Sequence, residues 1–386
     1  MHTVVVGGGF AGVKAALELS KKQIGKVTLI SNEPYFLHHA TLYATATGRS
    51  AAESIIPLNE IFFNHPNVTV VQDTVTSIDP DRKLVVSDKK SYQYDNVIIA
   101  LGSVTTYFGI SGMEQHAYGI KSLDEIRAFH QHIENEVVHE GQLDRNYVII
   151  GAGPTGVELV GALCEYLHHL IDLHQLKHAR VKLSLIEAAP RILPRSSATA
   201  AKIVEKRLKA IGVDVQTNKK VEALDEENIT IAGKKVPTKT AVWTSGVANH
   251  PFFKANASYF DLAPNGRANV NKFLEGHKDI YVIGDNNTVQ YGGLAWPALR
   301  QGAFVAQHLA RKASGRPLKA YKPALPPSGI PVGDKWGYVE WFGVYAAGRP
   351  GSLIRRLIEL VDYCNILPFQ KAVAIWRSHD ISQVDI

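Results

Sequence analysis

The pattern Gly-x-Gly-x-x-Gly occurs twice in this chain of 386 residues. The first set is Gly7, Gly9 and Gly12. The second set is Gly151, Gly153 and Gly156. Glycines at this spacing permit a tight turn, a close approach of the backbone to a pyrophosphate, and close packing of a helix on a strand. The two sets therefore predict two binding sites for dinucleotides.

Each glycine set follows an apolar run and precedes a segment with helical character. Residues 4–6 and 147–150 are typical of strands that are buried on both faces. Helices are predicted over 13–19 and 157–170. A pyrophosphate would lie at each helix N-terminus, where free N–H groups and the helix dipole favour anions. Because the whole strand–turn–helix unit is repeated, it is stronger evidence than a single glycine pattern.

Composition limits the class of protein. Hydrophobic residues make up 45% and charged residues 20% of the chain, as in ordinary globular enzymes, and the length predicts two or three domains. The net charge of +6 without a long basic block argues against nucleic-acid binding. Cys164 and Cys364 form no C-x-x-C pair, so we expect neither a disulfide framework nor a metal site. We expect no signal peptide before the first strand and no membrane-spanning helix.

The position that binds ribose differs between the two units. A carboxylate is expected about 20 residues beyond the glycines. In the second unit Glu187 ends the strand predicted over 181–186, and its charge would repel a 2′-phosphate, so NADH is favoured over NADPH. Arg191 nearby keeps NADPH as a minor alternative. In the first unit Ser31 occupies this place, with Glu33 two positions later, and these residues form either a ribose contact or a plain turn.

Two further apolar strands end in small or acidic residues. The strand predicted over 96–100 runs into Gly102 and Ser103, where the backbone would approach a dinucleotide. The strand over 280–283 ends in Gly-Asp, and Asp285 is expected to face the linker of the first dinucleotide. A helix is predicted over 296–313, with its N-terminus towards a flavin ring.

These stretches resemble the two-dinucleotide-binding flavoprotein oxidoreductases, and within them the type II NADH dehydrogenases (NADH:quinone oxidoreductases). The matching pieces, which cover about residues 3–312, are VVVGGGFAG, YDNVIIALGS, TTYFGISG, VIIGAGPTGVEL, LIEAAPRILP, AVWTSGV and IYVIGDN. The resemblance implies an α/β fold with two Rossmann-like domains of the glutathione-reductase type, one for FAD and one for NADH, and a small C-terminal α/β region. The expected domains are 1–112 and 263–314 for FAD, 113–262 for NADH, and 315–386 for membrane association or dimerisation.

The resemblance also implies an activity. A hydride would pass from NADH to flavin N5, and two electrons would then pass to a quinone without proton pumping. We expect a peripheral homodimer on the cytoplasmic side of the cell membrane, and otherwise a cytoplasmic protein. The alternative is a soluble NADH-dependent reductase with a protein acceptor such as ferredoxin. A sulfide:quinone oxidoreductase is disfavoured, because Cys164 lies on the helix after the second glycine set. A catalytically idle nucleotide-sensing protein is the alternative from another class.

In such flavoproteins a redox dithiol falls near residues 35–48, a segment that contains no cysteine here. This argues against a disulfide reductase or a cysteine-based peroxidase.

The resemblance assigns roles to individual residues. Gly7, Gly9, Gly12, Ser103 and Asp285 belong to FAD, and Gly151, Gly153, Gly156 and Glu187 belong to NADH. Further cofactor contacts are expected from Ser31, Glu33, Val75, Ala100, Gly102, Gly246, Ala295 and Trp296. Glu158 and Gln301 are the expected catalytic residues. Glu158 would orient the carboxamide or relay a proton; alternatively it is a helix-start acid that serves the macrodipole, an effect of about 0.3–1 kcal/mol.

One departure from the family pattern concerns the quinone side of the flavin. The family carries an Ala-Gln pair and further glutamines before a glycine, whereas this chain has Trp296 and Pro297 after Ala295. Gln301 and Gly302 match the family. Proline suits a first helical turn, and Trp296 would either stack on a quinone or cap the site.

The tail begins with a predicted linker over 313–335, followed by a strand over 336–344 and a break over 348–351. A helix beyond the break places Leu353, Leu357, Leu360 and Val361 on one face, and Arg355, Arg356, Glu359 and Asp362 on the other. The apolar residues continue beyond Pro368. This helix is predicted either to bind the membrane surface or to pack on the protein's own core or on a dimer mate.

Overall fold

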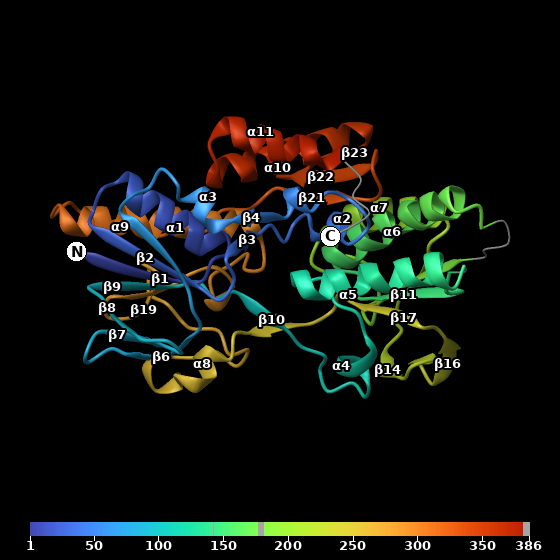
Figure 1. Cartoon of the computed structure of the whole chain (residues 1–386), viewed down its shortest axis with the longest axis horizontal. Helices are drawn as coiled ribbons and strands as arrows, with labels where there is room; N and C mark the ends of the chain where they lie inside the picture. The colour runs from blue at the N-terminus through green and yellow to red at the C-terminus, as the bar shows by residue number, and fades with distance from the viewer. Residues whose placement is uncertain (142, 177–180, 381–386) are drawn as a thin grey trace.

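A computed structural model describes residues 1–141, 143–176 and 181–380 of the chain. Two α/β lobes lie side by side, and the C-terminal segment runs along one side of both (Figure 1). A two-stranded antiparallel ribbon, β10 (Ser103–Thr105) and β18 (Val247–Asn249), links the lobes. The last six residues of the predicted 315–386 region lie outside the described residues.

The first lobe contains a six-stranded sheet in the order β19-β20-β9-β1-β2-β5. Its strands are β1 (His2–Val6), β2 (Lys26–Ser31), β5 (Val68–Gln72), β9 (Asn96–Ile99), β19 (Glu275–His277) and β20 (Ile280–Val282). All neighbours are parallel except β19 and β20. The sheet therefore joins the start of the chain to residues 275–282, and the carboxyl ends of β1, β9 and β20 meet at one edge.

Helices α1 (Phe10–Lys21) and α9 (Ala295–Ala313) cover one face of this sheet (Figure 1). The two helices pack closely, since a Cβ on Gly302 would come within 2.4 Å of the carbonyl oxygen of Ala11. The other face carries the antiparallel sheet β6 (Val75–Asp79), β7 (Leu84–Ser87) and β8 (Ser91–Gln93), with α8 (Phe252–Ala255). Both faces of the six-stranded sheet are thus buried, which explains its uninterrupted apolar strands.

The second lobe repeats this plan with a parallel sheet in the order β13-β12-β11-β17. Its elements are β11 (Asn146–Ile150), β12 (Lys182–Ile186), β13 (Asp214–Gln216), β17 (Thr240–Trp243), α5 (Leu123–Glu134), α6 (Pro154–Leu173) and α7 (Ala198–Ala210). An antiparallel sheet of β14 (Val221–Leu224), β15 (Asn228–Ile231) and β16 (Lys234–Pro237) lies below it in Figure 1. The predicted α/β class with two Rossmann-like lobes is confirmed.

Short elements connect these layers. They are β3 (Tyr35–Leu37) paired with β4 (Ile55–Pro57), and the single-turn helices α2 (Leu42–Thr45), α3 (Leu58–Ile61) and α4 (Met113–His116).

The C-terminal region differs from its prediction in two places. The segment predicted as a linker contains strand β21 (Ser328–Pro331), and the predicted single strand is a hairpin of β22 (Gly337–Trp341) and β23 (Val344–Gly348). Phe342 and Gly343 both have positive φ, as a two-residue type I′ turn requires. The predicted break over 348–351 is instead the start of helix α10 (Arg349–Ile366), because proline fits a first helical turn.

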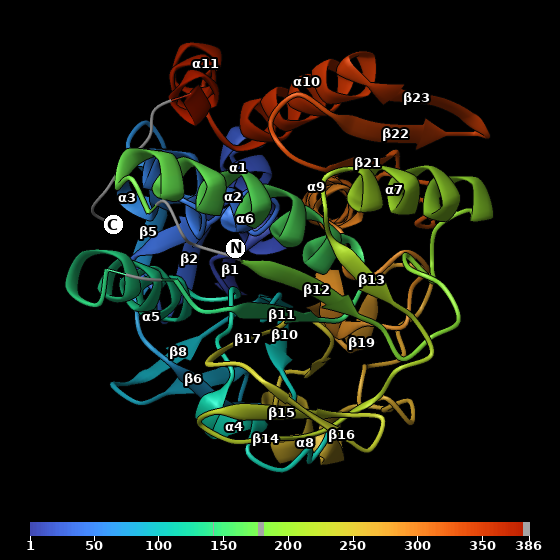
Figure 2. The ribbon, with the colours of Figure 1, turned by 90° about the vertical axis from the view of Figure 1, so that its right-hand side faces the viewer.

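Helix α10 is amphipathic as predicted, but its charged face points inward. Arg355, Glu359 and Asp362 are 6%, 1% and 6% exposed, whereas Leu353 and Val361 are 61% and 57% exposed. The helix packs on the β21–β23 sheet and is followed by α11 (Phe369–Arg377). Figure 2 shows the β22–β23 hairpin running alongside α10, above α7. The apolar face therefore remains uncovered in the single chain, and among the described residues no helix is long and apolar enough to cross a bilayer.

Candidate dinucleotide-binding and redox site

The first glycine set forms the turn between β1 and α1. Gly7 has a φ of +112°, and a Cβ on Gly12 would come within 2.0 Å of the Gly7 carbonyl oxygen, so neither position accepts a side chain. A Cβ on Gly9 would meet no protein atom within 4 Å. Gly9 is also the N-cap of α1, and no side chain caps this helix. The turn is therefore closed on its inner side and open, with free N–H groups, on its outer side.

The second glycine set has the same geometry. Gly151 has a φ of +104°, and a Cβ on Gly156 would come within 1.9 Å of the Gly151 carbonyl oxygen. A Cβ on Gly153, the uncapped N-cap of α6, would meet nothing within 4 Å. Two uncapped helix N-termini behind open glycine turns fit the pyrophosphates of two dinucleotides.

Glu187 lies beside the second turn, as its position after β12 predicts. Its carboxylate accepts hydrogen bonds from the backbone N–H groups of Ala152 and Ala189, both at 2.8 Å. The Arg191 guanidinium donates to four backbone carbonyls, those of Leu193, Pro194, Ser196 and Ser197. Arg191 is the side chain that kept NADPH as an alternative. Because its guanidinium is hydrogen-bonded to the backbone of its own loop, it is not directed at a 2′-phosphate.

The corresponding residues of the first unit are less uniform. Ser31 is buried at the end of β2, and its hydroxyl oxygen lies 2.6 Å from where a Gly8 Cβ would stand, against the glycine turn. Glu33 is exposed. Burial of Tyr35 and the neighbouring Glu33 carboxylate together raise the pKa of Tyr35 to about 12. The Val75 side chain belongs to the apolar cluster beneath the sheet. Of these three, Ser31 stands nearest to the turn.

Several predicted cofactor contacts meet at the carboxyl edge of the first sheet. A Cβ on Gly7 would come within 2.2 Å of the Ala100 carbonyl oxygen, so the turn rests on the end of β9. Gly102 donates to and accepts from the Asn286 side chain, at 2.9 and 2.7 Å. Ser103 donates to Asp285 Oδ2 at 3.1 Å. The predicted strand ends are thus brought together by the parallel order of β1, β9 and β20.

The start of α9 lies next to this edge. Asp285 Oδ1 accepts a hydrogen bond from the Gly293 N–H at 2.8 Å, and this bond holds the loop before Ala295. No side chain caps the N-terminus of α9. The Arg300 guanidinium stacks on the Trp296 ring, 4.7 Å from its centroid. Gln301 is buried, and its Oε1 accepts from Gly284 N–H and Asn287 Nδ2, both at 2.8 Å. Gln301 therefore braces the Gly-Asp turn from behind.

Glu158 lies on the first helical turns of α6 within a buried group of charges contributed mainly by α10. Burial raises its pKa to about 8, while Arg355 lowers it and Glu359 raises it further. Arg355 forms an ion pair with Glu359 at 3.0 Å, and Arg356 forms another at 2.6 Å. Glu158 was identified from the sequence, but its link to the charged residues of α10 was not predicted.

The raised pKa of Glu158 predicts a change in stability with pH. A carboxyl group whose folded pKa exceeds its unfolded value, about 4.3, binds its proton more tightly in the fold. Its contribution is therefore complete below the unfolded pKa and is lost as the pH rises through the folded pKa of about 8. We expect Glu158→Gln to remove part of the fall in unfolding temperature between pH 5 and 8, measured by calorimetry. The exposed Glu60→Gln is the control, and parallel profiles for E158Q and wild type would contradict the assignment.

One further feature of this edge was not predicted. Lys121, which precedes α5, donates from Nζ to Ser103 Oγ at 2.9 Å and so joins the edge described above. Gly246, one of the predicted cofactor contacts, lies at the linking ribbon, where a Cβ would come within 2.2 Å of the Thr106 carbonyl oxygen. The only sequence signal for Lys121 is its place just before the Ser122 helix cap.

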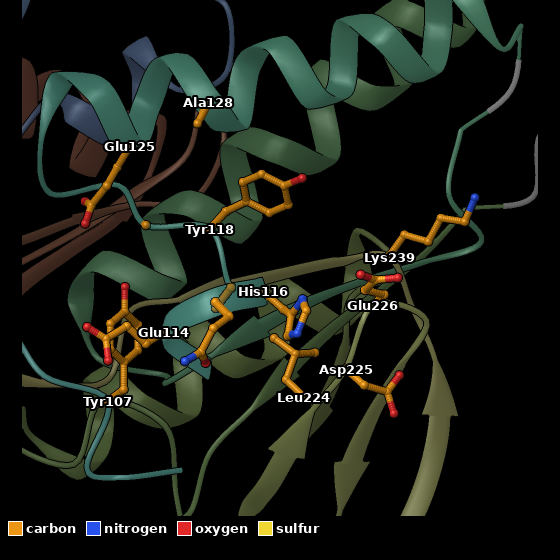
Figure 3. A pocket seen from close by; sticks show the side chains of 13 residues that line it. Tyr107, Glu114, His116, Tyr118, Glu125, Ala128, Leu224, Asp225, Glu226 and Lys239 are labelled. Carbon is orange, nitrogen blue, oxygen red and sulfur yellow. The ribbon is translucent and has the colours of Figure 1, made fainter. Parts of the chain in front are cut away.

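A cavity of about 500 Å³ lies apart from these residues, between α4, α5 and the β14–β16 sheet. Figure 3 shows Tyr107, Tyr118 and Glu125 on one side and Leu224, Asp225 and Lys239 on the other. It includes none of the predicted cofactor residues.

Two open glycine turns, each at an uncapped helix start, and a carboxylate beside the second turn are the arrangement expected of a protein that binds two dinucleotides. The chain belongs to the pyridine nucleotide-disulphide oxidoreductase family, whose model matches residues 1–302. It is an NADH-dependent flavoprotein oxidoreductase, with FAD and NADH as its cofactors.

The resemblance to type II NADH:quinone oxidoreductases is confirmed. A protein of that name from Staphylococcus epidermidis is 28% identical over 379 residues, which cover 92% of this chain and 93% of the relative. NDH2 from Plasmodium falciparum, solved in complex with NADH, has the same fold, with a TM-score of 0.84 at 16% identity over 98% and 97% of the two chains. The sulfide:quinone oxidoreductase of Aquifex aeolicus matches with a TM-score of 0.80 at 19% identity, over 97% and 92% of the chains.

Proposed function

We propose that this protein oxidises NADH and reduces a quinone at a membrane surface, without pumping protons. FAD, when bound, supplies the step that accepts a hydride at N5 and passes two electrons onward. The observation that supports a quinone acceptor most strongly is the relative named for that reaction, which aligns with 92% of this chain. The two cysteines do not form a dithiol: Cys164 is buried on α6 and Cys364 is exposed on α10.

The proposal gives each lobe one cofactor. The turn at Gly9 and the edge with Ser103 and Asp285 hold FAD, and the turn at Gly153 with Glu187 holds NADH. We retain the domain division 1–112, 113–262, 263–314 and 315–386.

The remaining assigned residues are given supporting roles. Glu158 is assigned to orient the carboxamide or to relay a proton, while Gln301 positions the Gly-Asp turn by its two hydrogen bonds. Ala295 and Trp296 lie at the uncapped start of α9, which the proposal assigns to the quinone side of the flavin.

Anaerobic stopped-flow absorbance tests this function. NADH is expected to bleach the bound flavin rapidly, and a short-chain quinone is expected to restore its colour. Bleaching without reoxidation by quinone would eliminate the quinone and favour the alternative, a soluble reductase with a protein acceptor such as ferredoxin. If NADH fails to bleach the flavin, the protein is catalytically idle and both proposals are wrong.

The nucleotide preference depends on Glu187. We expect NADH to reduce the flavin much faster than NADPH, because juxtaposing the carboxylate and a 2′-phosphate costs several kcal/mol. Glu187→Gln is expected to lower the ratio of the two rates by about tenfold or more, since the amide can still accept from Ala152 N–H. Glu33→Gln in the other unit is the matched control. An unchanged ratio in E187Q would contradict this placement of the ribose.

The uncovered apolar side chains of the C-terminal region support the membrane surface as a partner. We call these residues the C-terminal apolar face: Trp341, Phe342, Val344, Tyr345, Leu353, Ile354, Leu357, Val361 and Phe369, all of which are exposed. Large exposed apolar patches mark interaction sites, and helices with such a face lie in the interfacial layer of a bilayer. A homodimer would cover the same face.

Leu357 tests the membrane proposal. It is 48% exposed on α10, and full burial of a leucine contributes about 1.5–3 kcal/mol. Leu357→Glu is expected to weaken sedimentation with phosphatidylglycerol–phosphatidylethanolamine vesicles by about tenfold or more. The control is Leu173→Glu on α6, an exposed leucine outside the C-terminal region. If L357E binds vesicles normally but elutes as a monomer where wild type is a dimer, the face is a dimer interface instead.

A further inference from the structure

Lys121 connects the two lobes through one hydroxyl group. Its ammonium donates to Ser103 Oγ at 2.9 Å, and Ser103 donates its single proton to Asp285 Oδ2 at 3.1 Å. The direction of both bonds is settled, because an ammonium can only donate and a carboxylate accepts. Lys121 precedes Ser122, the N-cap of α5 in the second lobe, whereas Asp285 follows β20 in the first. Two hydrogen bonds through Ser103 therefore link the ammonium group of one lobe to a carboxylate of the other.

The backbone around Lys121 is held in place. Glu125 Oε2 accepts from the N–H groups of Lys121 and Ser122, at 2.6 and 3.0 Å, and Ser122 caps Glu125 in return. A Cβ on Gly119 would collide with the Glu125 carboxylate, so the segment before Lys121 lies close to this cap. The backbone from which the Lys121 side chain extends is therefore fixed by the helix cap.

Lys121 is half-buried, and its ammonium donates to a neutral hydroxyl group, that of Ser103. Burial lowers the pKa of Lys121 to about 8, while Asp285 and Glu125 raise it, so the charged form still predominates at pH 7. A partly desolvated cation of this kind exerts a stronger field on its neighbours than one in bulk water.

We infer that Lys121 positions the Asp285 carboxylate through Ser103 and supplies a positive charge that raises the reduction potential of FAD. This inference rests on the proposed placement of FAD against Asp285. Reduction adds negative charge to a flavin, and protein charges near it tune that equilibrium. Without Lys121 the Asp285 charge stands uncompensated at the cofactor site and favours oxidised FAD.

The test is a spectroelectrochemical titration of the purified holoenzyme. Lys121→Met removes the charge at similar length and is expected to shift the reduction equilibrium of FAD at least tenfold towards the oxidised form, a fall of about 30 mV for two electrons. Lys121→Arg keeps the charge and is expected to retain the wild-type potential. A side chain that is merely structural would change the unfolding temperature and leave the potential as it was.

Other variants separate this inference from the proposed function. Ser103→Ala removes the hydroxyl group that links Lys121 to Asp285 but keeps the ammonium. The reduction potential of FAD in S103A is expected to fall by a smaller amount than in K121M. If K121M does not fold, S103A tests the inference. An unchanged potential in K121M or in S103A, with FAD still bound, overturns this inference alone. Retention of FAD by Gly9→Ala would overturn the placement of FAD and this inference with it.

Discussion

Gly153→Ala is expected to weaken NADH binding by about 10- to 100-fold while the protein stays folded and keeps its FAD. Gly153 has ordinary extended dihedrals, with φ of −69°, and an added Cβ would meet no protein atom within 4 Å. The substitution therefore costs the protein little by itself. The new methyl group would instead occupy the space above the helix start, where the pyrophosphate must approach the backbone.

Gly9→Ala is the matched control, because Gly9 stands in the equivalent open place of the first turn. G9A is expected to lose FAD and G153A to lose NADH affinity, with unfolding temperatures of the cofactor-free proteins close to wild type. Flavin absorbance after gel filtration and the NADH dependence of flavin bleaching measure the two effects. If both variants kept both cofactors, the open turns would not be the binding sites.

Arg355→Met is expected to lower the free energy of unfolding by about 3–5 kcal/mol, because it removes one partner of a buried ion pair. Arg355 is buried and paired with Glu359, and its charge also stabilises Asp362 and Glu158. The loss is expected to be smaller at pH 5 than at pH 8. Burial raises the pKa of Asp362 to about 6 and that of Glu158 to about 8, so both accept protons as the pH falls.

Urea unfolding followed by circular dichroism measures this loss, with Arg349→Met as the control. Arg349 is an exposed cation on the first turn of the same helix, so R349M is expected to stay within about 0.5 kcal/mol of wild type. If R355M were as stable as R349M, the inward charged face of α10 would not hold the C-terminal region to the lobes.

Local sequence patterns were sufficient for the parts of the fold that depend on local geometry. The glycine turns, the buried strands beside them and the carboxylate after β12 all follow from residues close together in the chain, because the turn, the strand and the helix start constrain one another within about 30 residues. Gln301 and Asp285 were also identified from sequence, but only the structure shows that they share the Gly-Asp turn.

Only the tertiary structure decided which face of α10 is buried. Helical periodicity separates Leu353 and Leu357 from Arg355 and Glu359, and the usual expectation places the apolar side inward. Here the buried carboxylate of Glu158 and the pair formed with Glu359 favour the guanidinium of Arg355 inside. A sequence window along one helix contains no information about charges contributed by other segments of the chain.

The same limit applies to Lys121. Lys121 and its partner Ser103 are 18 residues apart in the sequence, and Ser103 and Asp285 are 182 residues apart. These groups meet only because the parallel order of β9 and β20 places two strand ends at one edge, and because α5 starts beside it. The sequence by itself determined the class of cofactor and the two glycine turns to which we assign its binding. Tertiary structure decided the charges that meet at the proposed flavin site and the surface that the C-terminal helices leave uncovered, since both depend on contacts between distant segments.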